Sequence, residues 1–253
     1  MKIPGYVRAV IGRVPDSDGV INPQVGVVFK LTGDTTLHAS VGKKTRFPHM
    51  QELYGVMSGG NPDLQKQKTM AYEIGAKHYF TKSLKGWFSY FYNDVEDLIE
   101  RIYPAGGKDW RYENVGEARI QGIEGGLDYQ VSDNFWAGAN YTYLSTKDKE
   151  TDHELEGRPR HKLNFDLRYL FSFGLTANLQ TSYTHREFAY DRGESRKYPD
   201  FFLVNAKLIQ KLGNYFGIDS EAFVSVSNLT DKNYDEGDPM PGRNFLTGLT
   251  FRR

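Results

Sequence analysis

Hydrophobic and polar residues alternate strictly along several long segments of this chain. From His161 to Phe171, apolar or aromatic side chains occupy almost every second position, and Lys, Asn, Asp and Arg occupy positions between them. Segments 175–184 and 69–80 repeat the pattern. A period of two indicates β-strands that have one apolar and one polar face.

Twelve segments have this character, and many of them are long. They are approximately residues 5–14, 24–33, 35–46, 69–80, 84–103, 110–131, 135–148, 161–171, 175–184, 201–212, 215–230 and 242–251. A tilted strand needs about 9–11 residues to cross a bilayer, roughly twice the length of an average globular strand. The strand lengths therefore favour a transmembrane sheet.

Short and long connections alternate between the predicted strands. The short turns are Gly33-Asp34, 81–83, 132–134, 172–174 and Gly213-Asn214, and the longer polar connections are 15–23, 47–68, 104–109, 149–159, 191–200 and 231–241. Such alternation is typical of up-and-down barrels with short periplasmic turns and long extracellular loops. We expect an all-β fold, an antiparallel up-and-down transmembrane β-barrel of about twelve strands. One domain over residues 1–253 would place both termini on the periplasmic side.

Large aromatic residues flank the short turns. They are Tyr79, Phe80, Trp87, Phe88, Phe135, Trp136, Phe171, Phe173, Tyr215 and Phe216. Aromatic side chains collect at the headgroup level of a membrane, where they form a girdle around a barrel. A soluble β-sandwich whose aromatic residues merely end its strands is the alternative interpretation.

Composition narrows the function classes. The chain has 253 residues, 32 basic and 32 acidic side chains, no cysteine and 14% aromatic residues. A neutral chain lacks the basic excess of a nucleic-acid-binding protein, and without cysteine it can form no disulfide or thiolate site. No apolar run approaches the roughly 18 residues of a membrane-spanning helix. The start Met1-Lys2-Ile3-Pro4-Gly5 lacks the apolar core of a signal peptide, so we expect a mature or truncated chain or an intracellular protein.

Several motifs, in order and spacing, resemble the TonB-dependent outer-membrane receptors. They are Gln24–Leu31, Leu37–Gly42, Arg46-Phe47-Pro48, Glu52-Leu53-Tyr54, Gly60–Leu64, Tyr72–Lys77, Phe91–Asp94, Asp97–Ile99, Asn114–Ala118, Gly122–Glu124, Arg158–His161 and Val226–Tyr234. The resemblance runs from about Val25 to Phe251 and is to the C-terminal part of the barrel domain. It implies an outer-membrane location in a Gram-negative bacterium and the uptake of a scarce nutrient such as a ferric siderophore, without enzymatic activity.

The chain departs from this family in three places. Lys66-Gln67 stands near the position of the family's Pro-Glu, and the chain ends in Phe251-Arg252-Arg253 instead of an aromatic residue, which bears on assembly. Complete receptors have 22-stranded barrels with a plugged lumen. The resemblance therefore implies part of a receptor, or a reduced barrel, that cannot perform energised transport without its plug. Unpaired strand edges are costly in lipid, so closure or pairing with a partner is expected.

No catalytic or phosphate-binding motif is present, and we expect no enzyme activity, cofactor or metal site. A solvated outer loop accounts for the charges of residues 147–156 without a metal ion. Candidate ligand contacts in the outer loops are His153, His185, Arg186 and Tyr190.

Ten polar residues on the predicted wet faces would line the lumen. They are Glu73, Lys77, Glu124, Asp128, Asn164, Asp166, Arg168, Lys207, Asp219 and Glu221. One interpretation is a ladder of cross-strand pairs that stabilises the wall. The other is a surface that contacts a plug or a solute, and the two are compatible.

The expected partners are outer-membrane lipid, a ferric siderophore or similar nutrient, and the plug domain and TonB in a full-length receptor, with no nucleic acid. Two alternative functions stay open. A closed barrel of about twelve strands could act as a passive pore. A soluble β-rich carbohydrate-binding protein would instead have an apolar interior and a polar outside.

Overall fold

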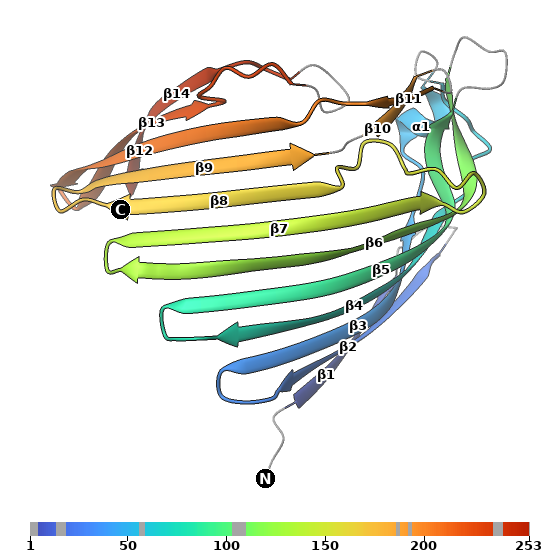
Figure 1. Ribbon diagram of the computed structural model, residues 1–253, viewed down its shortest axis with the longest axis horizontal. Coiled ribbons are helices and arrows are strands. Elements are labelled where there is room, and N and C mark those ends of the chain that lie inside the picture. The colour runs from blue at the N-terminus through green and yellow to red at the C-terminus, as the bar shows by residue number, and fades with distance from the viewer. Residues whose placement is uncertain are drawn as a thin grey trace.

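The computed structural model describes residues 5–13, 19–55, 59–102, 110–185, 188–191, 194–234 and 240–252, and one twelve-stranded sheet dominates this part of the chain (Figure 1). Its strands are β1 (Gly5–Arg13), β2 (Ile21–Lys30), β3 (Thr35–Arg46), β4 (Gln67–Tyr79), β5 (Leu84–Ile102), β6 (Arg111–Ser132), β7 (Phe135–Asp148), β8 (His161–Leu170), β9 (Leu175–His185), β12 (Phe201–Tyr215), β13 (Ile218–Ser227) and β14 (Asn244–Arg252). A helix, α1 (Met50–Tyr54), and a separate hairpin of β10 (Phe188–Asp191) and β11 (Glu194–Lys197) lie in the connections. Within this part of the chain, no helix is long and apolar enough to cross a membrane.

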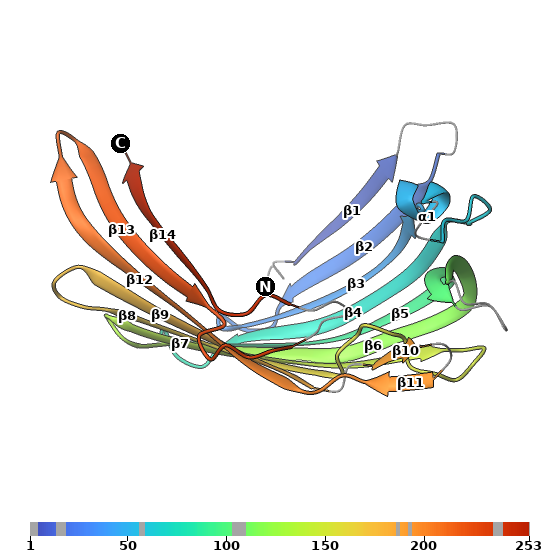
Figure 2. The same ribbon diagram turned by 90° about the horizontal axis from the view of Figure 1, so that it is seen from above.

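Every strand of the large sheet pairs antiparallel with its neighbours in chain order, and β9 pairs with β12 across the β10–β11 insertion. The predicted count of twelve strands and the up-and-down order are confirmed. The sheet bends into an open trough, with β1 and β14 apart on its two sides (Figure 2). Closure through a β1–β14 pair, one expected solution to the problem of free edges, is not observed between these strands.

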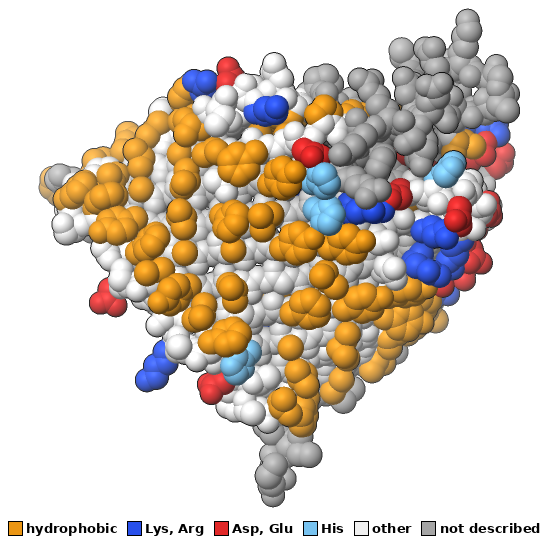
Figure 3. Space-filling view, viewed as in Figure 1, with side chains coloured by type: hydrophobic (Ala, Val, Ile, Leu, Met, Phe, Trp, Pro, Cys, Tyr) orange, Lys and Arg blue, Asp and Glu red, His pale blue; other side chains and the backbone are white. Residues whose placement is uncertain are grey.

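The two faces of the sheet differ in polarity, as the alternation predicts. The convex face is covered with hydrophobic side chains (Figure 3). Ile74 is 59% exposed, Leu127 50% and Phe165 44%. Large apolar side chains left this open to the surroundings are typical of a lipid-facing wall and not of a globular core.

The dry interior is small and lies at the long-loop end of the sheet. Val95 and Leu98 of β5 pack with Ala118 of β6 and with Leu155 from the loop after β7. All four are at most 5% exposed. The cluster therefore stabilises the outer end of the molecule, while the wall itself is a single layer.

One predicted turn and one predicted connection are wrong. The β12–β13 turn is at Phe216-Gly217, both of which have positive φ angles, and not at Gly213-Asn214. The pairing register shifts between Lys211 and Gly213, so that glycine belongs to a β-bulge, and glycine suits bulges and turns equally well. Residues 191–200, predicted as an irregular connection, contain β11 and the end of β10.

The aromatic girdle beside the short turns is only partly confirmed. Phe80 and Phe88 lie on the convex face and are about half exposed. Their neighbours Tyr79 and Trp87 point to the concave face, where Trp87 lies against Gly126. Trp136 also faces the concave side, beneath the Arg168 guanidinium. Successive side chains of a strand point to opposite faces, so one member of each adjacent aromatic pair cannot contact lipid.

Candidate functional site

The long connection between β3 and β4 is an ordered outer structure. The Arg46 guanidinium donates two hydrogen bonds to the Glu52 carboxylate, at 2.9 and 3.1 Å, and the His49 backbone N–H donates a third at 2.7 Å. Burial raises the pKa of Glu52, but these hydrogen bonds and the Arg46 charge outweigh it and hold the pKa below its ordinary value. The charged carboxylate therefore secures α1 beside the end of β3.

The same connection is attached to β6. The Asn61 amide donates to the Tyr112 carbonyl oxygen at 3.0 Å, and the Tyr112 N–H donates to the Gly59 carbonyl oxygen at 2.9 Å. Leu64 is buried beneath this segment. The motif Gly60–Leu64 thus fixes the loop to the longest strand of the sheet.

The loop between β7 and β8 folds back onto the outer extension of β5 and β6. Leu155 enters the dry cluster, and its N–H donates to Thr146 Oγ1 at 3.0 Å. Arg158 donates to the Glu100 carboxylate at 3.0 Å, across 58 residues of sequence. Arg160 pairs with Glu154 within the loop. The two arginines of the Arg158–His161 motif therefore hold the loop in place.

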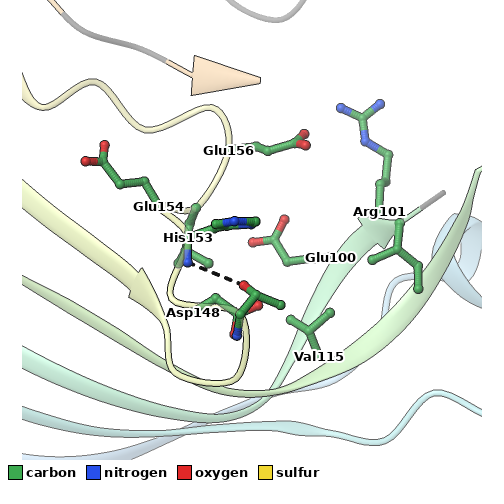
Figure 4. Close-up of a pocket in the computed structure, with 10 residues that line it drawn as sticks. Glu100, Arg101, Val115, Asp148, His153, Glu154 and Glu156 are labelled. Carbon is green, nitrogen blue, oxygen red and sulfur yellow. Dashed lines mark hydrogen bonds between the residues drawn. The ribbon is translucent and has the colours of Figure 1, made fainter. Parts of the chain in front are cut away.

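A pocket of about 250 Å³ lies between this loop and the β5–β6 extension (Figure 4). Its lining residues are Glu100, Arg101, Ile102, Val115, Asp148, Thr151, His153, Glu154, Leu155 and Glu156. Figure 4 shows the side chains of Glu100, Glu156 and His153 around one open space, with Arg101 at its edge. The pocket is at the long-loop end of the wall.

Carboxylates dominate the pocket lining. The Asp148 carboxylate accepts hydrogen bonds from the backbone N–H groups of Glu150 and Thr151, at 2.8 and 3.0 Å, so its main role is to shape the turn. The Arg101 guanidinium lies 5.2 Å from the centre of the Trp110 ring. Because Arg158 pairs with Glu100 and Arg160 pairs with Glu154, most of this negative charge is compensated, and the lining suits a ligand group that donates hydrogen bonds.

Lys149 links this turn to the wall. Its ammonium lies 2.6 Å from Asp94 and 2.8 Å from Glu117. Hydrogen bonds to these two carboxylates raise the pKa of Lys149 above its ordinary range. The lysine therefore stays charged at any physiological pH and joins β5, β6 and the loop.

The four loop residues predicted as ligand contacts have different positions. His153 lines the pocket. His185, at the end of β9, is not a pocket-lining residue; it pairs with Asp200 at 2.6 Å. Arg186 lies outside the described residues. Tyr190 belongs to β10, and the structure describes only its backbone.

All ten predicted wet-face residues lie on the concave face, opposite Ile74, Leu127 and Phe165. Glu73 is 3.1 Å from His38 Nε2, Asp128 is 2.6 Å from Lys85 Nζ, and Glu221 is 4.0 Å from Arg252. Asn164 donates to Asn140 at 2.8 Å, and Asp219 accepts from Asn214 at 2.8 Å.

Three cations of this set lie over aromatic rings: Lys77 over Tyr79, Arg168 over Trp136 and Lys207 over Phe223. For Glu124 and Asp166, the strand register assigns the side chains to the concave face. Several of these contacts are the cross-strand pairs that the first interpretation expects.

The wall also holds a concave cavity of about 500 Å³ near the short turns. Lys82, Lys85, Asp128, Trp136 and Arg168 are among its lining residues. The lining holds three cations, Lys82, Lys85 and Arg168, and two carboxylates, Asp128 and Asp166, so the short-turn end of the concave face is less acidic than the outer pocket.

Of the residues that line the outer pocket, His153 alone was predicted as a ligand contact. The pocket is held together by the Arg158–Glu100 pair and by the burial of Leu155. The sequence does hold one clue to this pocket: Arg158 and Arg160 follow an acidic loop, and such a combination favours ion pairs within the loop. Among the residues that the structure places, no group of three or more His, Asp or Glu side chains could hold a metal ion.

Comparison with known families shows the family to which the chain belongs. The family model described as TonB dependent receptor-like, beta-barrel matches residues 5–229. The chain belongs to this family. TonB-dependent receptors are outer-membrane proteins of Gram-negative bacteria that import nutrients and are not enzymes, so the predicted location, family and absence of enzymatic activity are confirmed. The soluble carbohydrate-binding alternative is wrong, because it required an apolar interior and a polar outside.

Two curated relatives support the assignment. The chain is 28% identical over 227 residues to the vitamin B12 transporter BtuB of Photobacterium profundum, covering 87% of this chain and 35% of that protein. It is 26% identical over 257 residues to the iron-regulated outer membrane virulence protein of Vibrio cholerae, covering 90% of this chain and 39% of that protein. The chain therefore spans somewhat more than a third of the length of these relatives.

Solved structures agree with the fold. The copper transporter OprC superposes with a TM-score of 0.75 at 24% identity, over 92% of this chain and 39% of OprC. The ferric enterobactin receptor PfeA of Pseudomonas aeruginosa superposes with a TM-score of 0.73 at 22% identity, over 91% of this chain and 40% of PfeA. At these identities the likeness establishes the barrel wall and not the transported ligand.

Proposed function

We propose that this chain supplies barrel wall and outer loops to a receptor that imports a scarce nutrient, such as a ferric siderophore. The observation that carries the proposal is the two-sided wall: an exposed apolar convex face and a polar concave face, topped by loops that fold into an acidic pocket. A passive pore needs a closed ring of strands, and the observed sheet is open between β1 and β14.

The two faces of the wall suit different partners. The convex face would contact outer-membrane lipid, because its large apolar side chains have no protein partner of comparable area. The concave face would contact a plug domain and line the path of the nutrient, through residues such as Lys85, Asp128 and Arg168. Energy would come from TonB through the plug, so the chain alone would not perform energised transport.

The outer pocket would contribute to capture of the nutrient. Glu154 and Glu156 lie on its loop side, and Arg101 lies at its edge. We expect the ligand portion at this pocket to offer hydrogen-bond donors, because two of its four carboxylates are already paired with arginines. The acidic groups of a siderophore would lie elsewhere, towards the concave cations.

Uptake experiments test this function. Deletion of the gene for the full-length protein should abolish accumulation of one ⁵⁵Fe-labelled siderophore, and a TonB-deficient strain should show the same loss. His153→Ala and Glu156→Gln should lower the apparent affinity for that siderophore, whereas Asp219→Asn at the short-turn end should not. Unchanged accumulation of all tested ferric siderophores in the deletion strain would contradict iron uptake. Steady conductance of the purified chain in planar bilayers would instead favour the passive pore.

A further inference from the structure

The apolar band of the convex face ends at a row of charged and imidazole side chains. In the five strands β5–β9, followed from the short-turn end outwards, the first such side chain on this face is Asp94 in β5, Arg119 in β6, Lys147 in β7, His161 in β8 and His185 in β9. Tyrosines such as Tyr141 and Tyr183 stand just inside this row. The row marks the level at which the wall leaves hydrocarbon and enters polar surroundings.

Two neighbouring members of this row are both histidines. The strand register pairs His161 directly with His185, and their ring centroids are 5.4 Å apart with the ring planes inclined by 47°. Cross-strand pairing on one face holds the two imidazoles together without any rearrangement of the backbone.

Each imidazole has an oxygen partner at Nδ1. His185 Nδ1 donates to the Asp200 carboxylate at 2.6 Å, and His161 Nδ1 lies 2.7 Å from the Tyr141 hydroxyl. The Tyr183 hydroxyl also donates to Asp200, at 3.3 Å, and the Tyr183 ring is stacked with the His185 ring. In proteins, an oxygen partner at one ring nitrogen orients a histidine whose other nitrogen binds a metal ion.

We propose that His161 and His185 bind one divalent transition-metal ion through their Nε2 atoms on the outer, membrane-exposed side of the wall. Water completes the coordination sphere, and Asp200 and Tyr141 act as positioning residues. Imidazole ligands select Cu²⁺ and Zn²⁺, with Cu²⁺ bound more tightly, whereas Mg²⁺ and Ca²⁺ require oxygen ligands.

Such an ion would join the outer ends of β8 and β9. His161 begins β8 at the end of the pocket loop, and His185 ends β9 immediately before the insertion that contains β10 and β11. Because the site is on the convex face, it is separate from the outer pocket and from the concave surface that carries the proposed function. A metal ion bound to the native state alone would stabilise these strand ends.

Metal titration of the full-length protein in detergent tests the proposal. Calorimetry with Zn²⁺, and electron paramagnetic resonance with Cu²⁺, should show one ion per molecule and nitrogen coordination. His161→Gln and His185→Gln should each weaken binding at least tenfold, while Asp200→Asn should weaken it less. His153→Gln, which changes a pocket histidine, is the matched control and should leave binding unchanged.

Two results would overturn the metal site. One is equal binding of Cu²⁺ in the wild type and in His161→Gln and His185→Gln proteins that keep the folded form on unheated gels. The other is a Cu²⁺ spectrum without nitrogen coordination. Neither result bears on siderophore uptake, which the deletion strain tests separately.

Discussion

Asn114 and Gln65 exchange two hydrogen bonds across 49 residues of sequence. The Gln65 N–H donates to Asn114 Oδ1 at 2.7 Å, and Asn114 Nδ2 donates to the Gln65 carbonyl oxygen at 3.1 Å. Asn114 Nδ2 also donates to the Asp97 carbonyl oxygen at 2.7 Å. One side chain of β6 therefore attaches the β3–β4 connection and β5 to the same point, which gives a structural reason for the first residue of the Asn114–Ala118 motif.

Asn114→Ala should loosen the β3–β4 connection without unfolding the wall. The lost hydrogen bonds contribute about 1 kcal/mol each, so local opening should become at least about fivefold more frequent. Limited proteolysis of intact outer membranes should cut the region 47–66 correspondingly faster. Asn178→Ala, in β9 and outside this network, is the control, and equal cleavage of both variants would contradict the role of Asn114.

Gly122→Val should impair assembly of the wall. A Cβ atom at Gly122 would overlap the Tyr143 carbonyl oxygen and would lie 2.7 Å from Phe91 Cζ. Overpacking of this kind costs about 1–3 kcal/mol. The amount of heat-modifiable protein in the outer membrane should fall, whereas Gly33→Ala should assemble normally because nothing lies within 4 Å of that position. Normal assembly of Gly122→Val would show that β5–β7 repack easily.

Leu167→Arg should be far more harmful than Gln180→Arg. Leu167 is 40% exposed on the convex face, and an arginine near the bilayer midplane costs about 2–4 kcal/mol. Gln180 faces the concave side, where an added cation stays in polar surroundings. Urea titration of the protein in lipid vesicles measures both free energies of unfolding. A larger loss for Gln180→Arg would reverse the assignment of the two faces.

Acid should release α1 from the end of β3. The pKa of Glu52 is lower in the folded protein than its ordinary value near 4.5, so its contribution to stability is complete above that pH. The contribution is lost as the pH falls from 4.5 through the lowered folded value. The protection of residues 49–55 from hydrogen exchange, measured relative to the intrinsic rate at each pH, should therefore fall over this interval in the wild type. In Glu52→Gln, this protection should already be lower at pH 7 and should change little with acid.

Period-two patterns predicted the wall strands well because the wall separates lipid from water along its whole length. Phe135–Asp148 and Thr35–Arg46 match the predicted strands at both ends, and β8 ends one residue earlier than predicted. Each strand must present one apolar and one polar face, so the number and order of the strands could be predicted from local sequence.

The outer structures could not be predicted in this way. Leu155 and Leu64 are single apolar residues in polar segments, and no period marks them as buried. Their burial depends on strands far away in sequence, such as β5 for Leu155. The pocket therefore emerges only when the long-range contacts are known, although its residue His153 was a candidate.

The pairing of His161 with His185 was easier to predict than the pocket. His185 was a predicted ligand contact, whereas His161 was assigned only to an alternating strand and to the Arg158–His161 motif. The short turn at 172–174 already implied the register that sets them side by side. The oxygen partner Asp200 lies beyond the β10–β11 insertion, and no local pattern connects it to β9.

The outer tip of β5 and β6 has a consequence for motion. It has its own dry cluster, and its base is at Asp97, where the backbone adopts a φ of 54°. Lys68 and Asn114 both bind Asp97, so the neighbouring connection is coupled to the same point. Because Leu155 and Arg158 fix the β7–β8 loop to this tip, an arriving nutrient that displaces the tip should move tip and loop together as one rigid lever about Asp97.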